Sequence, residues 1–100
     1  MLPKHPGKTL QADFLQALNL SQYALAKAIG VPPRRINQIV KGERAITPDT
    51  ALRLGAYFKV SEFYWMELQN QYDAGLERKA LAKVLSAIQP YGSPQTKSKL

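Results

Sequence analysis

Residues 22–41 read QYALAKAIGVPPRRINQIVK, and this stretch decides the fold. It divides into a helical segment, a glycine, and a second segment that opens with two prolines and two arginines. Ala26 suits a close helix crossing because its side chain is small, and Gly30 suits the positive φ of a tight turn. Ile36 and Ile39 then supply branched apolar side chains that can face inward. The spacing predicts a helix-turn-helix unit.

The face of the second helix opposite these isoleucines carries polar and basic residues and no acid. Arg can bind guanine O6 and N7 bidentately, and Asn or Gln can bind adenine N6 and N7. The residue that opens the first helix is placed to anchor a phosphate. The candidate DNA-binding residues are Gln22, Arg34, Arg35, Asn37, Gln38, Lys41 and Arg44. We expect Arg34, Arg35 and Gln38 to reach deepest into the major groove. The alternative interpretation is a solvated polar face.

The composition fits one small basic domain. The chain has 100 residues, 45% of them hydrophobic, and a formal charge of +7 from 14 Lys and Arg against 7 Asp and Glu. A folded basic domain favours nucleic acid as a partner over an acidic protein or an anionic membrane. No cysteine is present, which excludes disulfides and thiolate metal sites. No apolar run approaches the ~20 residues of a membrane span, and the N-terminus does not resemble a signal peptide, so we expect a cytoplasmic protein.

Helical signals recur along the rest of the chain, and clean alternation of apolar and polar residues does not. Ser21, Thr47 and Ser61 are expected to cap helices at their N-termini. Gly42 is expected to end the second helix of the helix-turn-helix unit. The expected apolar faces consist of Leu10, Phe14, Leu15 and Leu18 within residues 8–18, then Leu25, Ala26 and Ile29, then Ile36, Ile39 and Val40, then Ala51, Leu54 and Phe58, then Trp65, Leu68 and Tyr72. The sequence predicts an all-α fold of five to six helices.

Gly75 marks a kink or a boundary. Beyond it, apolar residues follow the i, i+3, i+4, i+7 pattern of an amphipathic helix, at Leu81, Val84, Leu85 and Ile88. We therefore expect a helix-turn-helix domain at 1–75, an amphipathic helix at 76–89 and a flexible tail at 90–100. The apolar stripe can fold back onto the domain, pair with a second copy or contact another protein.

Other sites are disfavoured. His5 is the single histidine, so no metal cluster is expected, and a loop-anchoring role beside Pro6 and Gly7 fits it better. The acids are scattered, the serines lack a neighbouring base, and there is no glycine-rich phosphate loop. We expect no enzyme, no cofactor and no metal. Four aromatic residues could stack on bases, but their helical spacing favours the core: Phe63, Tyr64, Trp65 and Tyr72.

Several motifs resemble those of one family. They are HPG at 5–7, LSQYALAKAIGVPPRRIN at 20–37, ITPDTALRL at 46–54 and FYWMELQ at 63–69. Together they resemble HigA-type (VapI-like) antitoxins of the Xre/Cro helix-turn-helix class, over about residues 5–73. The resemblance implies a lambda-repressor-like domain in a homodimer. It also implies a protein that represses its own operon by binding an inverted repeat in double-stranded operator DNA, and that neutralises a HigB-type mRNA-cleaving toxin.

Two alternatives stay open. One is a stand-alone Xre-family repressor without a toxin partner. The other is a protein-interaction module whose basic face meets an acidic partner. Membrane binding is not expected, since the 76–89 helix carries few basic residues.

Overall fold

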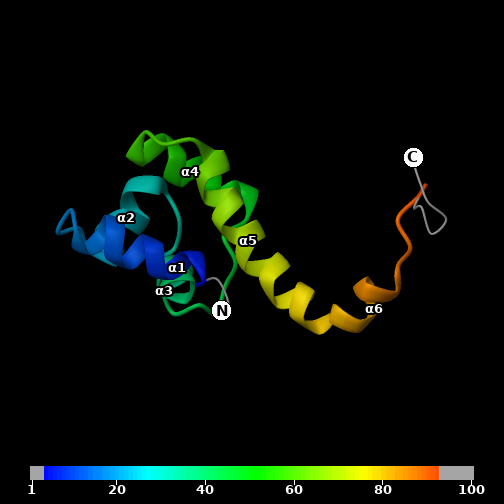
Figure 1. The fold of residues 1–100 in the computed structure, drawn as a ribbon. Helices are drawn as coiled ribbons and strands as arrows, with labels where there is room; N and C mark the ends of the chain where they lie inside the picture. Colours follow the sequence, from blue (N-terminus) through cyan, green and yellow to red (C-terminus); the bar gives the residue numbers. More distant parts are fainter. Residues whose placement is uncertain (1–3, 93–100) are drawn as a thin grey trace.

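The computed structural model describes residues 4–92, and over this range every regular element is a helix (Figure 1). The elements are α1 (Pro6–Thr9), the π-helical segment η1 (Leu10–Gln16), α2 (Gln22–Ile29), α3 (Pro33–Val40), α4 (Pro48–Phe58), α5 (Glu62–Ala80) and α6 (Ala82–Ala87). The predicted all-α class with a helix-turn-helix is confirmed. No helix in the described part of the chain is long and apolar enough to span a membrane.

The first helix starts earlier than the sequence indicated. His5 caps it, its ring Nδ1 accepting a hydrogen bond from the N–H of Gly7 over 2.9 Å, and Pro6 occupies the first turn. The anchoring role predicted for His5 is thus confirmed. The helix then widens into the i→i+5 turns of η1. Leu18, expected on the apolar face, is 59% exposed because it lies beyond the end of that helix.

The core is formed by η1, α2, α3, α4 and the first half of α5, and Trp65 is fully buried in it. The rings of Phe14 and Phe58 lie against the indole, with centroid distances of 4.8 and 6.5 Å. The buried apolar residues are Leu10, Leu15, Leu25, Ala26, Ile29, Val31, Ile36, Ile39, Ile46, Ala51, Leu54 and Trp65. Both helices of the helix-turn-helix unit, α2 and α3, therefore contribute buried side chains to this core.

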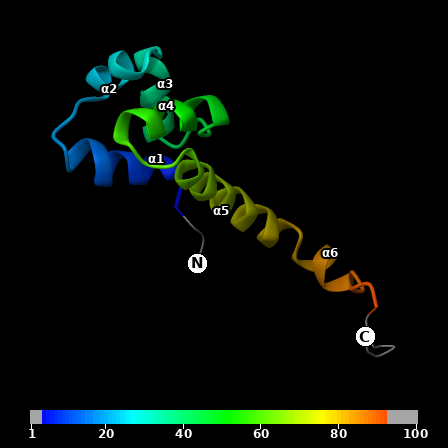
Figure 2. The ribbon, with the colours of Figure 1, turned by 90° about the horizontal axis from the view of Figure 1, so that it is seen from above.

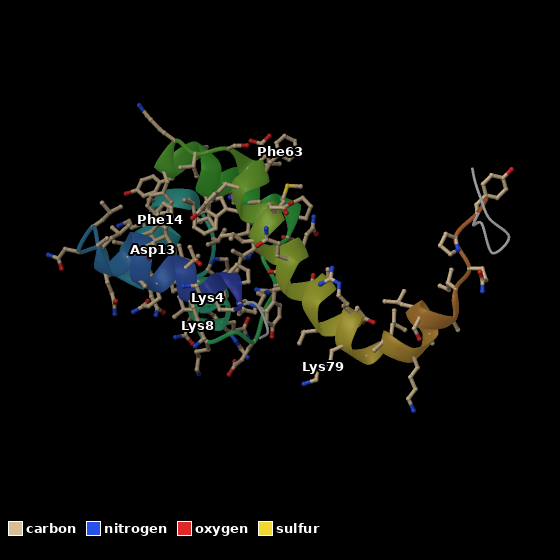
Figure 3. All side chains as sticks on the ribbon, in the orientation of Figure 1. Lys4, Lys8, Asp13, Phe14, Phe63 and Lys79 are labelled. Atoms are coloured by element: carbon tan, nitrogen blue, oxygen red, sulfur yellow. The ribbon has the colours of Figure 1, made fainter. Side chains whose placement is uncertain are left out.

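Two of the four aromatic residues expected in the core lie outside it. Phe63 is 66% exposed and Tyr64 is 41% exposed, at the start of α5 (Figure 3). Successive helical residues point in different directions, so when Trp65 faces the core the two residues before it cannot. Tyr72 is half-buried, with its ring edge-on to that of His5 at 5.0 Å.

The C-terminal helices differ from the expected layout. α5 runs through Gly75 without a break, since one glycine inside a helix costs only about 1 kcal/mol relative to alanine. The interruption falls at Leu81, and the short α6 follows it. A separate helix beginning at 76 is therefore wrong. The predicted division at 75/76 and the tail stay predictions, and residues 93–100 lie outside the described part of the chain.

The second half of α5 and α6 project from the rest of the fold (Figure 2). The molecule measures 58 × 23 × 22 Å along its principal axes as a result. Over the described residues the apolar stripe does not fold back onto the domain, because its members stay exposed: Leu81, Val84, Leu85 and Ile88. Of its three interpretations, folding back is wrong.

Candidate nucleic-acid interface

The turn between α2 and α3 has the predicted geometry. Gly30 adopts a left-handed conformation with φ 74°, which a residue with a side chain would enter with strain. The N–H of Val31 bonds the carbonyl of Ala26 over 3.0 Å, and Ala26 is fully buried. The turn is thus closed by backbone bonds, and it fixes the direction in which α3 leaves.

α3 is seated by its apolar face. Ile36 and Ile39 are both fully buried, so rotation of the helix about its axis would expose them. The opposite face consequently points outward. It carries Arg34 and Asn37, both exposed, and Arg35 and Gln38, both half-buried.

Gln22 and Asn37 are brought together across the unit. The side-chain Nδ2 of Asn37 donates a hydrogen bond to Oε1 of Gln22 over 3.2 Å. Ser21, just before Gln22, caps α2 by accepting from the N–H of Ala24 over 3.0 Å. Two predicted contact residues from different helices therefore form one continuous polar surface.

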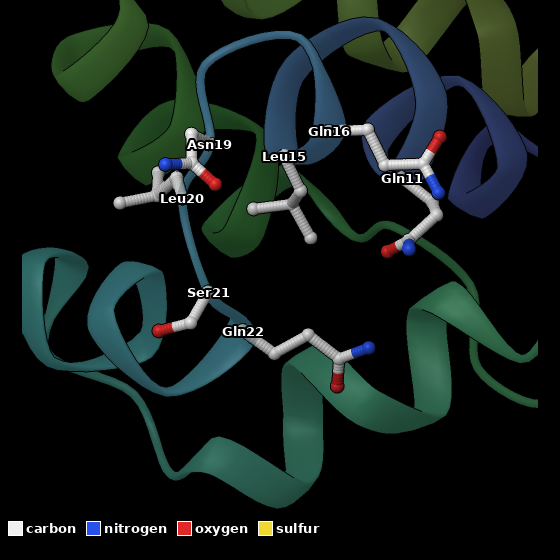
Figure 4. A pocket seen from close by; sticks show the side chains of 7 residues that line it. All are labelled: Gln11, Leu15, Gln16, Asn19, Leu20, Ser21 and Gln22. Carbon is white, nitrogen blue, oxygen red and sulfur yellow. The ribbon is translucent and has the colours of Figure 1, made fainter.

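A hollow of about 320 Å³ adjoins this surface, between η1 and the start of α2 (Figure 4). Its walls are Gln11, Leu15, Gln16, Asn19, Leu20, Ser21 and Gln22. Gln22 therefore lies between this hollow and the outward face of α3.

Arg35 has a partner that the sequence did not reveal. Its Nη1 lies 3.2 Å from Oδ1 of Asp49, in the first turn of α4. Nε of Arg53 lies 2.7 Å from the same oxygen, and Nη1 of Arg53 donates to the carbonyls of Ile29 and Gly30 over 2.8 and 3.3 Å. The outward face of α3 carries no acid of its own, and α4 brings a carboxylate to it.

Asp49 is held in its ionised form. The hydrogen bond from Arg53 has the largest effect and lowers the pKa of Asp49 below its usual 3.8. Desolvation, the next largest effect, opposes this shift, and the positive charges of Arg53 and Arg35 lower the pKa further. The contact to Arg35 is therefore charge-assisted at neutral pH.

Comparison with known proteins supports one assignment. Residues 12–65 match the helix-turn-helix family. The chain is 49% identical over 69 residues to virulence-associated protein I of Dichelobacter nodosus, a match that covers 69% of this chain and 64% of that protein. The structure of Pseudomonas aeruginosa antitoxin HigA with the higBA promoter is 39% identical and superimposes with a TM-score of 0.82, over 88% of this chain and 97% of that one. An antidote protein of the HigA family from Coxiella burnetii gives 36% identity and a TM-score of 0.84, over 91% and 100%.

The chain belongs to the HigA-type antitoxin family. The helix-turn-helix family model covers residues 12–65, from η1 to the first residues of α5. The chain spans 64% of the length of its Dichelobacter relative.

The two remaining predicted residues of this HigA-type chain lie beyond the core of the unit. Lys41 follows the last residue of α3, about 10 Å along the helix from Arg34 at a rise of ~1.5 Å per residue. Arg44 lies in the loop between α3 and α4, and its backbone is hydrogen-bonded to the His5 side chain. Ile46 in the same loop donates its N–H to Oε1 of Gln69 over 2.8 Å. The loop is thus tied to α1 and α5, which gives Arg44 a fixed position.

Asp49 and Arg53 are the residues that sequence reasoning missed. Their i, i+4 spacing on α4 was a signal that they would pair with each other. No sequence signal linked either of them to Arg35 or to the α2 carbonyls. Among the described residues of this HigA-type protein, no group of three potential metal ligands gathers.

Proposed function

We propose that this protein is a sequence-specific DNA-binding antitoxin that represses its own operon as a homodimer and neutralises a HigB-type mRNA-cleaving toxin. The observation that carries the DNA-binding part is the outward face of α3, on which Asn37 is bonded to Gln22 and Arg35 is bonded to Asp49.

The chemistry of this face fits double-stranded DNA. Amide and guanidinium groups are the donors and acceptors that match base edges in the major groove. α3 has its apolar face buried, so it can enter the groove without exposing the core. Lys41 and Arg44 add positive charge at the far end of α3, where phosphates would pass. The related HigA of Pseudomonas aeruginosa, solved with the higBA promoter, supports the proposal that this protein binds DNA.

A homodimer follows from the size of this footprint. One helix-turn-helix unit contacts few base pairs, and two units related by a two-fold axis would meet half-sites about 34 Å apart or a multiple of that distance. An inverted repeat upstream of the gene is the expected operator. Sedimentation of the protein with and without a duplex carrying the repeat would give the stoichiometry.

Fluorescence anisotropy tests DNA binding. The protein is titrated into the duplex upstream of its own gene and into a scrambled duplex, across a salt series. We expect the native duplex to be bound at least about 10³-fold more tightly at physiological salt. Lys41→Ala should weaken both duplexes and flatten the salt dependence. Lys79→Ala, which removes the same charge from the projecting half of α5, is the matched control and should change little (Figure 3). Equal binding to both duplexes, lost as salt rises, would instead support an acidic protein partner.

The toxin partner has a separate test. We expect a short reading frame for a basic protein beside this gene, and we expect its product to co-purify with this chain and to arrest growth when expressed alone. An Arg34→Ala, Arg35→Ala variant should still rescue growth, because those substitutions alter the DNA face only. A neighbouring product that neither binds nor arrests growth would leave a stand-alone repressor.

A further inference from the structure

Asp49 accepts hydrogen bonds from two arginines through a single oxygen. Oδ1 lies 3.2 Å from Nη1 of Arg35 and 2.7 Å from Nε of Arg53. Arg53 is itself fixed, since its Nη1 donates to the last carbonyls of α2. A continuous chain of contacts therefore runs from the end of α2 through α4 to the recognition residue on α3.

This chain leaves Arg35 partly free. A guanidinium has five N–H donors in a rigid fork, and the contact to Asp49 uses one nitrogen. The remaining donors can still meet the O6 and N7 acceptors of a guanine. A free arginine side chain loses rotamer freedom when it is ordered on DNA, and an arginine already held by a carboxylate loses less.

We propose that Asp49 is a positioning residue for specificity: it holds Arg35 in the orientation that reads guanine, while its negative charge weakens binding to DNA of every sequence. The proposal rests on the proposed function, because it assigns a role within operator recognition. The two effects differ in what they change. Positioning of Arg35 favours the specific complex and so raises discrimination, whereas a carboxylate near the phosphates weakens every complex and so lowers overall affinity.

The same contact could instead restrain Arg35 and keep it from DNA. The fixed position of Asp49 favours the positioning role. If Asp49 only competed with DNA for Arg35, it would not need a second arginine to anchor it. A carboxylate that positions Arg35 must itself be held in place, and Arg53 holds it. Of the two arginine contacts to Asp49, the one from Arg53 is the shorter. Arg53 also donates to a carbonyl at the end of α2, so it links Asp49 to that helix.

The test is Asp49→Asn, which keeps the shape of the side chain and removes the charge. Operator and scrambled duplexes are titrated by anisotropy at several salt concentrations, together with operators in which single G·C pairs are exchanged. We expect binding to the scrambled duplex to strengthen and the operator-to-scramble ratio to fall by between about 5-fold and 100-fold, with the loss concentrated at one G·C pair. Glu77→Gln, an equal charge change on the projecting half of α5, should leave the ratio unchanged.

Two further variants separate positioning from a general electrostatic effect. In an Arg35→Ala background, Asp49→Asn should lower the ratio no further, since the residue it positions is gone. Arg35→Lys keeps the charge but loses the fork, and should reduce the ratio as Asp49→Asn does. Thermal unfolding of each variant shows whether the fold is intact.

Three results would overturn the proposal. A ratio unchanged in Asp49→Asn would mean that the carboxylate acts on all DNA alike. A ratio that rises would mean that it restrains Arg35. If Asp49→Asn lowers the operator-to-scramble ratio as much in the Arg35→Ala background as in the wild type, Asp49 acts through another residue. If the wild-type protein itself does not discriminate, the proposed function fails, and this inference fails with it. If only the variant result disagrees, the proposed function stands.

Discussion

Asn37 of α3 donates a hydrogen bond to Gln22 of α2 over 3.2 Å, although fifteen residues separate them in the chain. The bond assigns each amide a direction. Nδ2 of Asn37 and Oε1 of Gln22 face each other, which leaves the carbonyl oxygen of Asn37 and the amino group of Gln22 for other partners. An acceptor and a donor are thereby offered side by side on the face proposed to meet DNA.

Gln22 and Asn37 should therefore contribute to operator binding as a pair. Gln22→Ala and Asn37→Ala are each expected to weaken binding. The double variant should lose less than the sum, with a coupling energy of about 0.5–3 kcal/mol, because either substitution breaks the same hydrogen bond. Anisotropy titrations of the four proteins measure this coupling. As a control, Gln22→Ala combined with Arg44→Ala should be additive within about 0.5 kcal/mol. Additivity in both pairs would show that the bond between the amides does not matter for DNA binding.

α1 approaches the end of α3 so closely that only glycine fits at the contact. A Cβ on Gly7 would collide with the backbone carbonyl carbon and oxygen of Ile39. Both are main-chain atoms, which cannot move aside as the end of a flexible side chain can. Gly7→Ala should therefore lower the free energy of unfolding by roughly 1–3 kcal/mol, the usual range for overpacking. Urea unfolding followed by circular dichroism measures the change. Lys8→Ala, at the exposed neighbouring position, should stay within about 0.5 kcal/mol of the wild type. Equal stability of the two variants would contradict the close approach.

Two predicted helix caps differ in the structure, and this difference can be measured. The hydroxyl of Ser21 accepts from the N–H of Ala24 over 3.0 Å, whereas Thr47 makes no side-chain capping bond at the start of α4. Ser21→Ala should cost about 1 kcal/mol of stability, the typical value for a lost N-cap. Thr47→Ala should cost clearly less. Chemical denaturation of both variants in one buffer measures the two losses of stability. A larger loss for Thr47→Ala than for Ser21→Ala would mean that Thr47 caps α4 as the sequence predicted.

The features that the sequence predicted correctly depend on local pattern. Ala26, Gly30 and the two isoleucines of α3 lie within fourteen residues, so their spacing alone specifies the turn and the buried face. The caps at Ser21 and Ser61 are local in the same way, since each accepts from an N–H within three residues.

The features that were missed depend on how distant segments meet. Arg35 and Asp49 are fourteen residues apart and pair only because α4 packs beside the turn. Phe63 is an aromatic residue of the kind expected in a core. The burial of Trp65 decides which face of α5 turns inward, so the side chain of Phe63 points outward. The break at Leu81 has no glycine or proline to mark it, so the sequence placed the change of direction at Gly75 instead.

His5 should make stability depend on pH. Its side chain is 8% exposed, between α1, the loop at Arg44 and the ring of Tyr72. Burial lowers the pKa of His5 from its ordinary 6.5, and the positive charge of Lys8 acts in the same direction, while Asp73 and the backbone hydrogen bond at Arg44 partly oppose the shift.

The unfolded chain consequently takes up a proton on His5 at a higher pH than the folded protein does. The contribution of neutral His5 is fully present above about pH 6.5 and is lost as the pH falls through the lowered pKa of the folded state. Urea unfolding of the wild type and of His5→Asn, which keeps a capping side chain but does not titrate, should show a stability difference that shrinks between pH 7.5 and pH 5. A difference that is constant over this range, or that grows toward acid pH, would mean that the proton on His5 is not excluded by the fold.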